Sequence, residues 1–293
     1  MWTRLLRPAR EEDGVSDAVL TLTAVILLLR PFDVWWVAPF VLTAACLSLV
    51  LRSVRRTPIT WLLVALLVAV WVVFVWPLSD NHIYLLAYWC LALGLALSGP
   101  APAATLAASS RWLLGAAFAM AVFWKAVLSP DYVDGRFFRV TLLTDERFAD
   151  ASLLFGGLSR DQMAGNREFL APLPDGAELL DPPAFVEPRR LRAFAAAATW
   201  GGMSLEALIA VLCLMPPRRW METARHAAVL TFCATTYALA PVAGFGWLIA
   251  TMGLAQCRPD QRRLRAAYLV AFVLILLFSE IPWTTVLADW TAS

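Results

Sequence analysis

The chain has 293 residues, of which 60% are hydrophobic and 16% are charged, and its formal net charge is +2. A water-soluble protein buries its apolar residues in one core, whereas this sequence places them in long uncharged runs that recur along most of the chain. The composition excludes disordered, collagen-like, coiled-coil and disulfide-scaffold proteins, and scattered arginines in a nearly neutral chain are not typical of nucleic-acid binding. We therefore expect an all-α protein, a polytopic bundle of transmembrane helices in contact with a lipid bilayer.

Five apolar runs in the first 128 residues approach the length of about 20 residues that a membrane-spanning helix needs. They cover residues 15–29, 34–51, 59–76, 83–97 and 112–128. The segment 129–190 holds eleven of the 22 acidic residues and many prolines and glycines, and we interpret it as an extracytoplasmic insert. Apolar sequence returns at 193–214, 227–256 and 264–278. We interpret residues 1–128 and 191–293 as one continuous membrane domain.

The run 227–256 is ambiguous, because at 1.5 Å per residue it is about 45 Å long, and Pro241, Gly244 and Gly246 interrupt its middle. Short loops rich in arginine stay in the cytoplasm. Such segments occur at the N-terminus (Arg4, Arg7, Arg10) and at 52–56, 218–225 and 258–265. Two short crossings within 227–256 keep both flanking arginine loops on one side. We predict about eight crossings in a bacterial inner membrane, with the N-terminus cytoplasmic and the C-terminus extracytoplasmic; the alternative for 227–256 is one kinked helix.

Cysteine and histidine do not form a pattern typical of a metal site. The five cysteines lie in or at the ends of apolar runs without a CxxC pair, so we interpret them as small core residues and expect no disulfide. The two histidines, His82 and His226, are predicted at opposite ends of the bundle. A metal or haem held by both is therefore not expected.

Lys125 is the single lysine among 24 basic residues, and it lies near the end of an apolar run in Phe123-Trp124-Lys125-Ala126-Val127. Arginine keeps its proton, whereas burial disfavours the charged form of lysine, so a buried lysine can become a neutral amine that acts as a base. The alternative is structural. Lys125 is close enough to the end of its predicted helix for the ammonium to extend to the lipid headgroups.

Asn81 and His82 follow Asp80 in the turn before the predicted helix 83–97. This turn and the end of helix 112–128 are expected on the same side of the membrane. Helices joined by a short loop are usually antiparallel neighbours, so we expect His82 to lie within reach of Lys125. A histidine at a helix start is more often an interface or capping residue than a catalyst, and Asn81 is a suitable N-cap.

These residues resemble those of a known family. Asn81-His82-Ile83-Tyr84-Leu85, the later membrane lysine and Asp131-Tyr132-Val133-Asp134-Gly135 are similar to motifs in the membrane domain of vitamin K-dependent gamma-carboxylases and their bacterial relatives, the HTTM (horizontally transferred transmembrane) proteins. The resemblance implies that Lys125 is the base that deprotonates a hydroquinone, with His82 and Asn81 assisting, and that a reduced quinone is the cofactor or partner. It does not extend to the large extracytoplasmic domain that engages a protein substrate in the carboxylase.

Five residues are candidates for substrate binding, because they adjoin the lysine motif or carry charge in an apolar run: Trp124, Asp131, Tyr132, Asp134 and Glu206. Glu206 follows paired glycines, which is similar to an acidic position in the family, and a carboxylate in hydrocarbon suggests function because it is costly. A helix that starts near residue 193 places Glu206 about 20 Å along it, too deep to touch Lys125, whereas a start near 201 places it closer. The structural alternative is a protonated or Ser/Thr-bonded acid.

Three functions fit these observations. The first is a membrane enzyme with Lys125 as general base on a lipid-soluble hydroquinone at the outer leaflet. The second is a non-enzymatic membrane scaffold, or a maturation or immunity partner for a secreted peptide, with the insert as its binding surface. The third is a proton-coupled transporter that uses Glu206 and Lys125.

Overall fold

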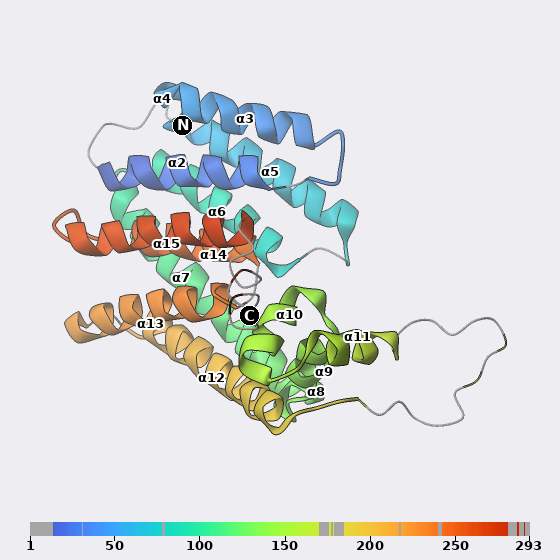
Figure 1. Cartoon of the computed structure of the whole chain (residues 1–293). Helices are drawn as coiled ribbons and strands as arrows, with labels where there is room; N and C mark the ends of the chain where they lie inside the picture. Colours follow the sequence, from blue (N-terminus) through green and yellow to red (C-terminus); the bar gives the residue numbers. More distant parts are fainter. Residues whose placement is uncertain are drawn as a thin grey trace.

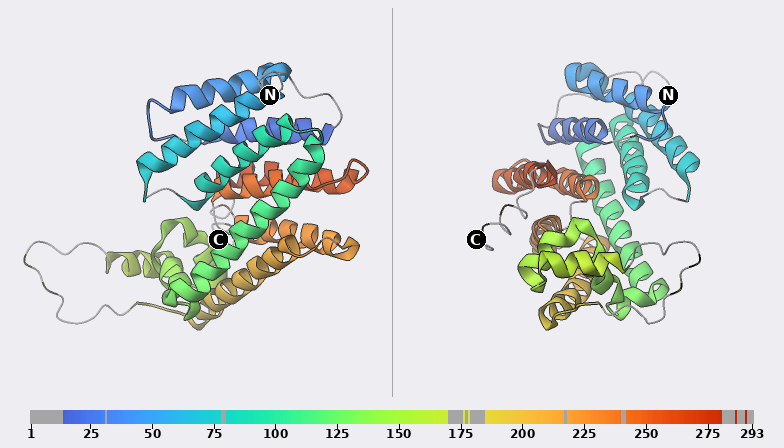
Figure 2. Two further views of the ribbon diagram at one scale, coloured as in Figure 1. Left: turned by 180° about the vertical axis from the view of Figure 1, so that it is seen from behind. Right: turned by 45° about the vertical axis from the view of Figure 1, so that its right-hand side comes forward.

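The structure is a computed structural model of the whole chain. It describes residues 14–30, 32–77, 80–169, 185–216, 218–239 and 242–280, with isolated residues at 176, 178, 286 and 290. All secondary-structure elements within these ranges are helices, and the long ones lie beside one another in a bundle (Figures 1 and 2). Arg4, Arg7 and Arg10, which entered the charge argument, lie outside the described residues.

The first five predicted membrane segments form helices. These are α2 (Gly14–Leu29), α3 (Ala38–Val50), α5 (Pro58–Val75), α6 (Asn81–Ser98) and α7 (Pro102–Phe123), with the short α4 (Arg52–Arg55) between α3 and α5. Proline lies in the first turn of α3, α5 and α7, where the backbone N–H has no partner in the helix and the fixed φ of proline favours helix. The helix predicted at 112–128 begins earlier, because the Ala-rich sequence after Pro102 has high helix propensity.

The second half of the bundle contains four long helices. These are α12 (Arg189–Leu214), α13 (Arg219–Tyr237), α14 (Ala243–Ala255) and α15 (Arg262–Glu280). The ambiguous run 227–256 therefore folds as two helices and not as one kinked helix. α14 packs against α15, α2, α7 and α13, so it occupies the middle of the bundle.

The predicted number of eight crossings is not confirmed. The predicted apolar segments correspond to nine helices within the described ranges, and only an odd number of crossings places the two termini on opposite sides of a membrane. Eight was therefore inconsistent with the predicted orientation. Among the described residues, four helices are long and apolar enough to cross a membrane: Pro58–Val75, Asn81–Ser98, Pro102–Leu128 and Arg189–Leu214. Asp17–Leu29, Ala38–Val50 and Gly244–Ala255 are apolar but shorter.

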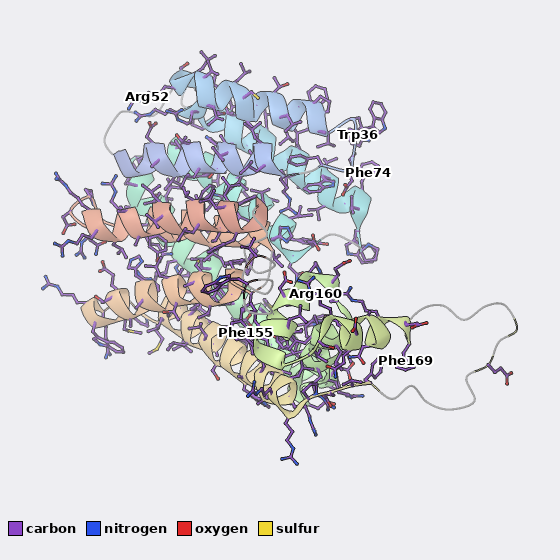
Figure 3. The ribbon with its side chains drawn as sticks, in the orientation of Figure 1. Trp36, Arg52, Phe74, Phe155, Arg160 and Phe169 are labelled. Atoms are coloured by element: carbon purple, nitrogen blue, oxygen red, sulfur yellow. The ribbon has the colours of Figure 1, made fainter. Side chains whose placement is uncertain are left out.

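The two ends of the bundle differ in chemistry. α4, the α12–α13 connection and the α14–α15 turn, all rich in arginine, lie at one end, which we call the basic end (Figure 1). Arg52 marks this end, whereas Trp36, Phe74 and the insert lie at the other end (Figure 3). At the basic end, Asp17 pairs with Arg55 at 3.0 Å and with Arg56 at 3.2 Å. The predicted grouping of the three described arginine loops on one side is thus present in the fold.

The outer surface of the bundle is strongly apolar. Val73, Phe74, Leu66 and Met120 are each at least 60% exposed, and many other large apolar side chains are more than one third exposed. Soluble monomers rarely expose contiguous apolar surface on this scale, whereas hydrocarbon tails solvate it without cost. The fold therefore supports a membrane-associated protein.

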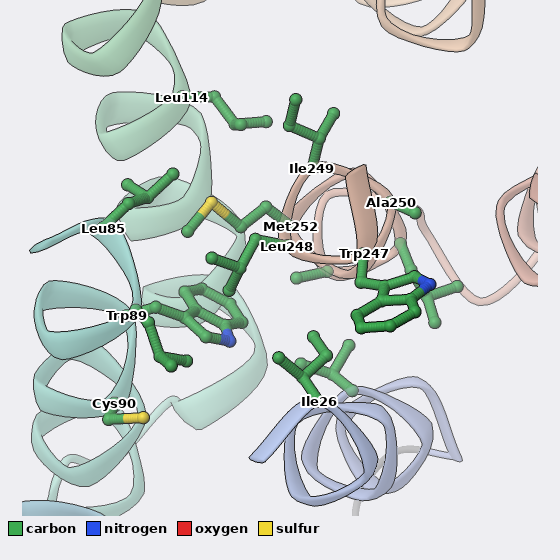
Figure 4. Close-up of a cluster of buried hydrophobic side chains, with 14 of the residues drawn as sticks. Ile26, Leu85, Trp89, Cys90, Leu114, Trp247, Leu248, Ile249, Ala250 and Met252 are labelled. Atoms are coloured by element: carbon green, nitrogen blue, oxygen red, sulfur yellow. The ribbon is translucent and has the colours of Figure 1, made fainter. Parts of the chain in front are cut away.

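The core is built around α14. Its side chains Leu248, Ile249 and Met252 are completely buried. They lie between α6, which contributes Leu85 and Trp89, and α7, which contributes Leu114 (Figure 4). The indole of Trp89 donates to the Thr23 hydroxyl at 3.0 Å, which satisfies a buried N–H and ties α6 to α2.

The predicted insert is a small helical unit that packs on the first turns of α12. After the π-helical turn η1 (Trp124–Leu128) come α8 (Pro130–Val133), α9 (Arg136–Thr144), η2 (Glu146–Phe148), α10 (Ala149–Ala151), η3 (Ser152–Gly156) and α11 (Arg160–Glu168). Leu142, Leu143 and Leu158 form a separate apolar cluster with Leu191 and Ala195 of α12. The start of α12 therefore belongs to the insert, and the rest of the helix belongs to the membrane bundle.

Gly94 permits close contact between α5 and α6. A Cβ at this position would lie 2.6 Å from Leu62 Cδ2 and 3.1 Å from the Leu62 backbone N. We expect Gly94→Ala to lower the free energy of unfolding by about 1 to 2 kcal/mol, because overpacking costs more than the roughly 1 kcal/mol of helix propensity that alanine adds. Thermal unfolding of the purified protein in detergent measures the change.

Gly201 provides the matched control, since it also lies inside a helix and a Cβ there would meet nothing within 4 Å. Gly201→Ala should leave stability unchanged or raise it slightly. Equal effects of the two substitutions would contradict the packing of α5 against α6 described above.

Candidate functional site

Lys125 and Glu206 form an ion pair that joins α7 to α12. The Lys125 Nζ lies 2.5 Å from Oε1 and 2.7 Å from Oε2 of Glu206, so the ammonium donates to both oxygens of one carboxylate. The Lys125 side chain is 22% exposed and that of Glu206 is 10% exposed. A pair so far removed from water costs more to desolvate than most surface pairs, and such groups often serve function.

Two helix geometries bring the pair together. The π-helical turn η1 extends α7 beyond Phe123 and carries Lys125. Further back along α7, Arg111 Nη1 donates to the Met215 carbonyl oxygen at 2.9 Å, and this hydrogen bond holds α7 beside the end of α12. The expectation that a helix starting near 193 puts Glu206 too deep is wrong. α12 starts at Arg189, and its first turns pack on the insert, so distance along the helix does not measure depth in the membrane.

A tyrosine ring contacts the pair. The Tyr132 ring lies 4.9 Å from the Lys125 Nζ, a distance suited to a cation–π contact. Burial, and secondarily the negative charge of Glu206, raises the pKa of Tyr132 above its usual range. The predicted proximity of Tyr132 to Lys125 is therefore present in the structure.

Tyr237 is a member of this site that the sequence did not reveal. Its side chain is buried, its hydroxyl has no hydrogen-bond partner among the described residues, and the charge of Glu206 acts on it. A tyrosine at the end of an apolar helix carries no local signal that distinguishes it from a core residue. Its burial within range of the Glu206 charge depends on the packing of α13.

His82 lies with other partners. Its Nε2 is 3.8 Å from an Asp80 carboxylate oxygen, and a Cβ on Gly244 would lie 3.1 Å from the same Nε2 and 2.7 Å from Arg30 Nη1. No hydrogen bond or ion pair joins His82 to Lys125 in the described part of the chain. Asn81 is the exposed first residue of α6, and the N-cap is Asp80, not Asn81.

The remaining predicted residues lie on the surface near the pair. Asp131 and Asp134 both bind Arg136, at 2.7 and 2.6 Å, and are largely exposed. The backbone N–H and the guanidinium of Arg136 hold the pKa of Asp134 below its usual value. Trp124 is 61% exposed and adjoins Lys125 on η1. Asp131 and Asp134 therefore brace the loop after α7, and within the described residues no hydrogen bond or ion pair joins them to the Lys125 amine.

No family model, curated protein sequence or solved structure matches the chain. The five cysteines are free thiols. Within the ranges that the structure describes, no group of three His, Cys, Asp or Glu side chains is arranged to hold a metal ion. The groups that contact one another at the Lys125–Glu206 site are an amine, a carboxylate and the phenol ring of Tyr132.

Substitution of one member of the pair should destabilise the protein more than substitution of both. We expect Lys125→Met or Glu206→Leu to lower the free energy of unfolding by about 3 to 5 kcal/mol, because each leaves a buried charge unpaired. The double variant K125M/E206L should recover most of this loss. A double-mutant cycle of thermal stability in detergent measures the coupling.

Arg136→Met, which breaks the exposed contacts with Asp131 and Asp134, should change stability little and serves as the control. Additive losses in the cycle would show that the two charges do not interact in the folded protein.

Proposed function

We propose that this chain is an integral membrane enzyme of the gamma-carboxylase-like HTTM class, in which the Lys125–Glu206 pair transfers a proton from a lipid-soluble hydroquinone. The observation that carries the proposal is the bidentate ion pair itself, which gives the single lysine an adjacent acceptor for its own proton. A lysine that only extended to headgroups would not need a buried carboxylate on a neighbouring helix.

The proton step balances within the pair. The Lys125 ammonium first gives a proton to Glu206: an N–H bond breaks, an O–H bond forms, and a neutral amine and a neutral acid remain. An apolar environment favours a neutral amine and acid over an ion pair more than water does. The amine lone pair then takes the hydroquinone hydroxyl proton, and the electrons of the broken O–H bond stay on the phenolate oxygen. The new ammonium stabilises that phenolate electrostatically.

Access to the amine is from the lipid side. Lys125 keeps 22% of its side chain exposed, and its neighbours on η1, Trp124 and Val127, are each 61% exposed. An apolar ring with one hydroxyl suits this surface, because the ring can stay in hydrocarbon while the hydroxyl meets Nζ. In the proposal, Asn81 and His82, at the start of α6, contact a more distant part of the substrate.

The proposal includes an orientation in a bacterial inner membrane. The basic end faces the cytoplasm, by the excess of arginine in its loops, and the insert and the Lys125 site face the outer leaflet.

A second candidate function is a scaffold or a partner for a secreted peptide. The observation that favours it is the insert, which exposes Phe137, Phe155 and Phe169 to 48%, 50% and 46%. Aromatic residues are enriched in the centres of interfaces. A function of this kind should be lost on serine substitution of these three residues and kept in the Lys125 variants.

The proton-transfer proposal predicts faster oxidation of a hydroquinone by dissolved oxygen, since a phenolate reacts with oxygen faster than the neutral form. The probe is 2-methyl-1,4-naphthohydroquinone added to the protein in lipid nanodiscs, with quinone absorbance as the readout. Lys125→Arg and Lys125→Met should each lower the protein-dependent oxidation rate by about 100-fold or more, because neither side chain can act as the base.

Arg160→Gln, on the exposed start of α11, is the control and should retain the wild-type rate. A rate in wild-type nanodiscs no higher than in empty nanodiscs, or full activity in both Lys125 variants, would refute the proposal.

A further inference from the structure

A second buried polar cluster lies at the basic end, away from Lys125. α13 places Arg225 and His226 in the interior with only 6% and 3% of their surfaces exposed. The His226 Nδ1 is 2.8 Å from the Tyr268 hydroxyl of α15. Arg111 on α7 is near enough for its positive charge to act on Arg225, so α7, α13 and α15 contribute to the cluster.

The cluster contains N–H donors that have no hydrogen-bond acceptor among the described residues. The Nε and Nη1 of Arg225 and the Nε2 of His226 are buried without a hydrogen-bond partner in the described part of the chain. If Tyr268 donates to Nδ1, then the His226 Nε2 carries the ring proton and is also a donor. Leaving a buried charged donor without an acceptor costs several kcal/mol.

The surrounding charges do not neutralise Arg225. The Arg111 guanidinium adds a second positive charge, and its recorded hydrogen bond is to the neutral Met215 carbonyl. Glu222 is the nearby acid, but both of its oxygens accept from Arg258 at 3.0 Å, and one also accepts from Gln261 at 2.8 Å. Cys213 and Tyr268 are neutral groups. The cluster thus has excess positive charge together with buried donors that have no partner among the described residues.

We propose that Arg225, His226 and Arg111 bind a phosphate-type oxyanion between α7, α12 and α13. Such an anion supplies several oxygen acceptors around one centre, which matches a guanidinium fork and an imidazole N–H better than a monodentate ion does. The site lies where the helices end among the arginine loops, at the level expected for lipid headgroups. Basic pockets between helices on the cytoplasmic side commonly hold anionic lipid headgroups.

The phosphate can belong to an anionic phospholipid of that leaflet or to free inorganic phosphate, and both share the chemistry that the site recognises. The inference does not depend on the proton-transfer proposal, because the two sites share no residue. Loss of one function should therefore leave the other intact.

Thermal unfolding of the delipidated protein in neutral detergent tests the site. Wild type should gain stability with dihexanoylphosphatidylglycerol, or with sodium phosphate compared with sodium chloride at equal ionic strength, and not with dihexanoylphosphatidylcholine. A response to inorganic phosphate assigns a small-anion site, and a response to the phosphatidylglycerol alone assigns a lipid headgroup site. No response to either probe would mean that water molecules accept the hydrogen bonds of these donors, and this result would overturn the proposal.

Arg225→Met should raise the melting temperature in the absence of anion, because it removes an unpaired buried charge, and should increase the concentration for half-maximal stabilisation at least about tenfold. Arg111→Gln should weaken the response to anion as well, which keeps the test valid if Arg225→Met folds poorly. Arg219→Gln, on the exposed start of α13, should respond as wild type does. An unchanged anion response in both Arg225→Met and Arg111→Gln would refute the site.

Discussion

A charge inside this bundle needs a counter-charge close to it, because the surrounding apolar side chains and lipid tails cannot solvate it. Lys125 and Glu206, which are 81 residues apart in the sequence, meet this requirement across two helices. Their contact fixes the relative positions of α7 and α12 near the insert. The candidate chemistry follows from the same contact, because a lysine so close to a carboxylate can exchange its proton without any change of net charge in the pair.

Two clusters at the basic end differ in how far they meet the same requirement. Asp17 accepts hydrogen bonds from both Arg55 and Arg56, so that cluster serves to hold α2 to the α3–α5 connection. Around Arg225 the nearby carboxylate already binds Arg258, and the positive charge has no counterpart among the described residues. Arginines at the same end of the bundle therefore differ in their pairing. Asp17 binds Arg55 and Arg56, whereas Glu222 binds Arg258 and leaves Arg225 without a carboxylate partner in the described part of the chain.

α12 connects the insert to the Lys125–Glu206 pair. Its first turns complete the apolar cluster of the insert, and Glu206 lies further along the same helix. The exposed acids Asp131 and Asp134, bound to Arg136, lie at the junction between the two parts.

The sequence by itself determined the helical membrane class, the insert, the positions of most helices and the special status of Lys125 and Glu206. Hydrophobic run length and the cost of isolated charges are local properties, so they can be read without contacts. Tertiary structure decided the partners: Glu206 for Lys125, Asp80 for His82, and a buried place for Tyr237 and Arg225. These pairings depend on where α12 begins, on how α7 continues through a π-helical turn and on how α13 packs, and small differences in helix register change which side chains meet.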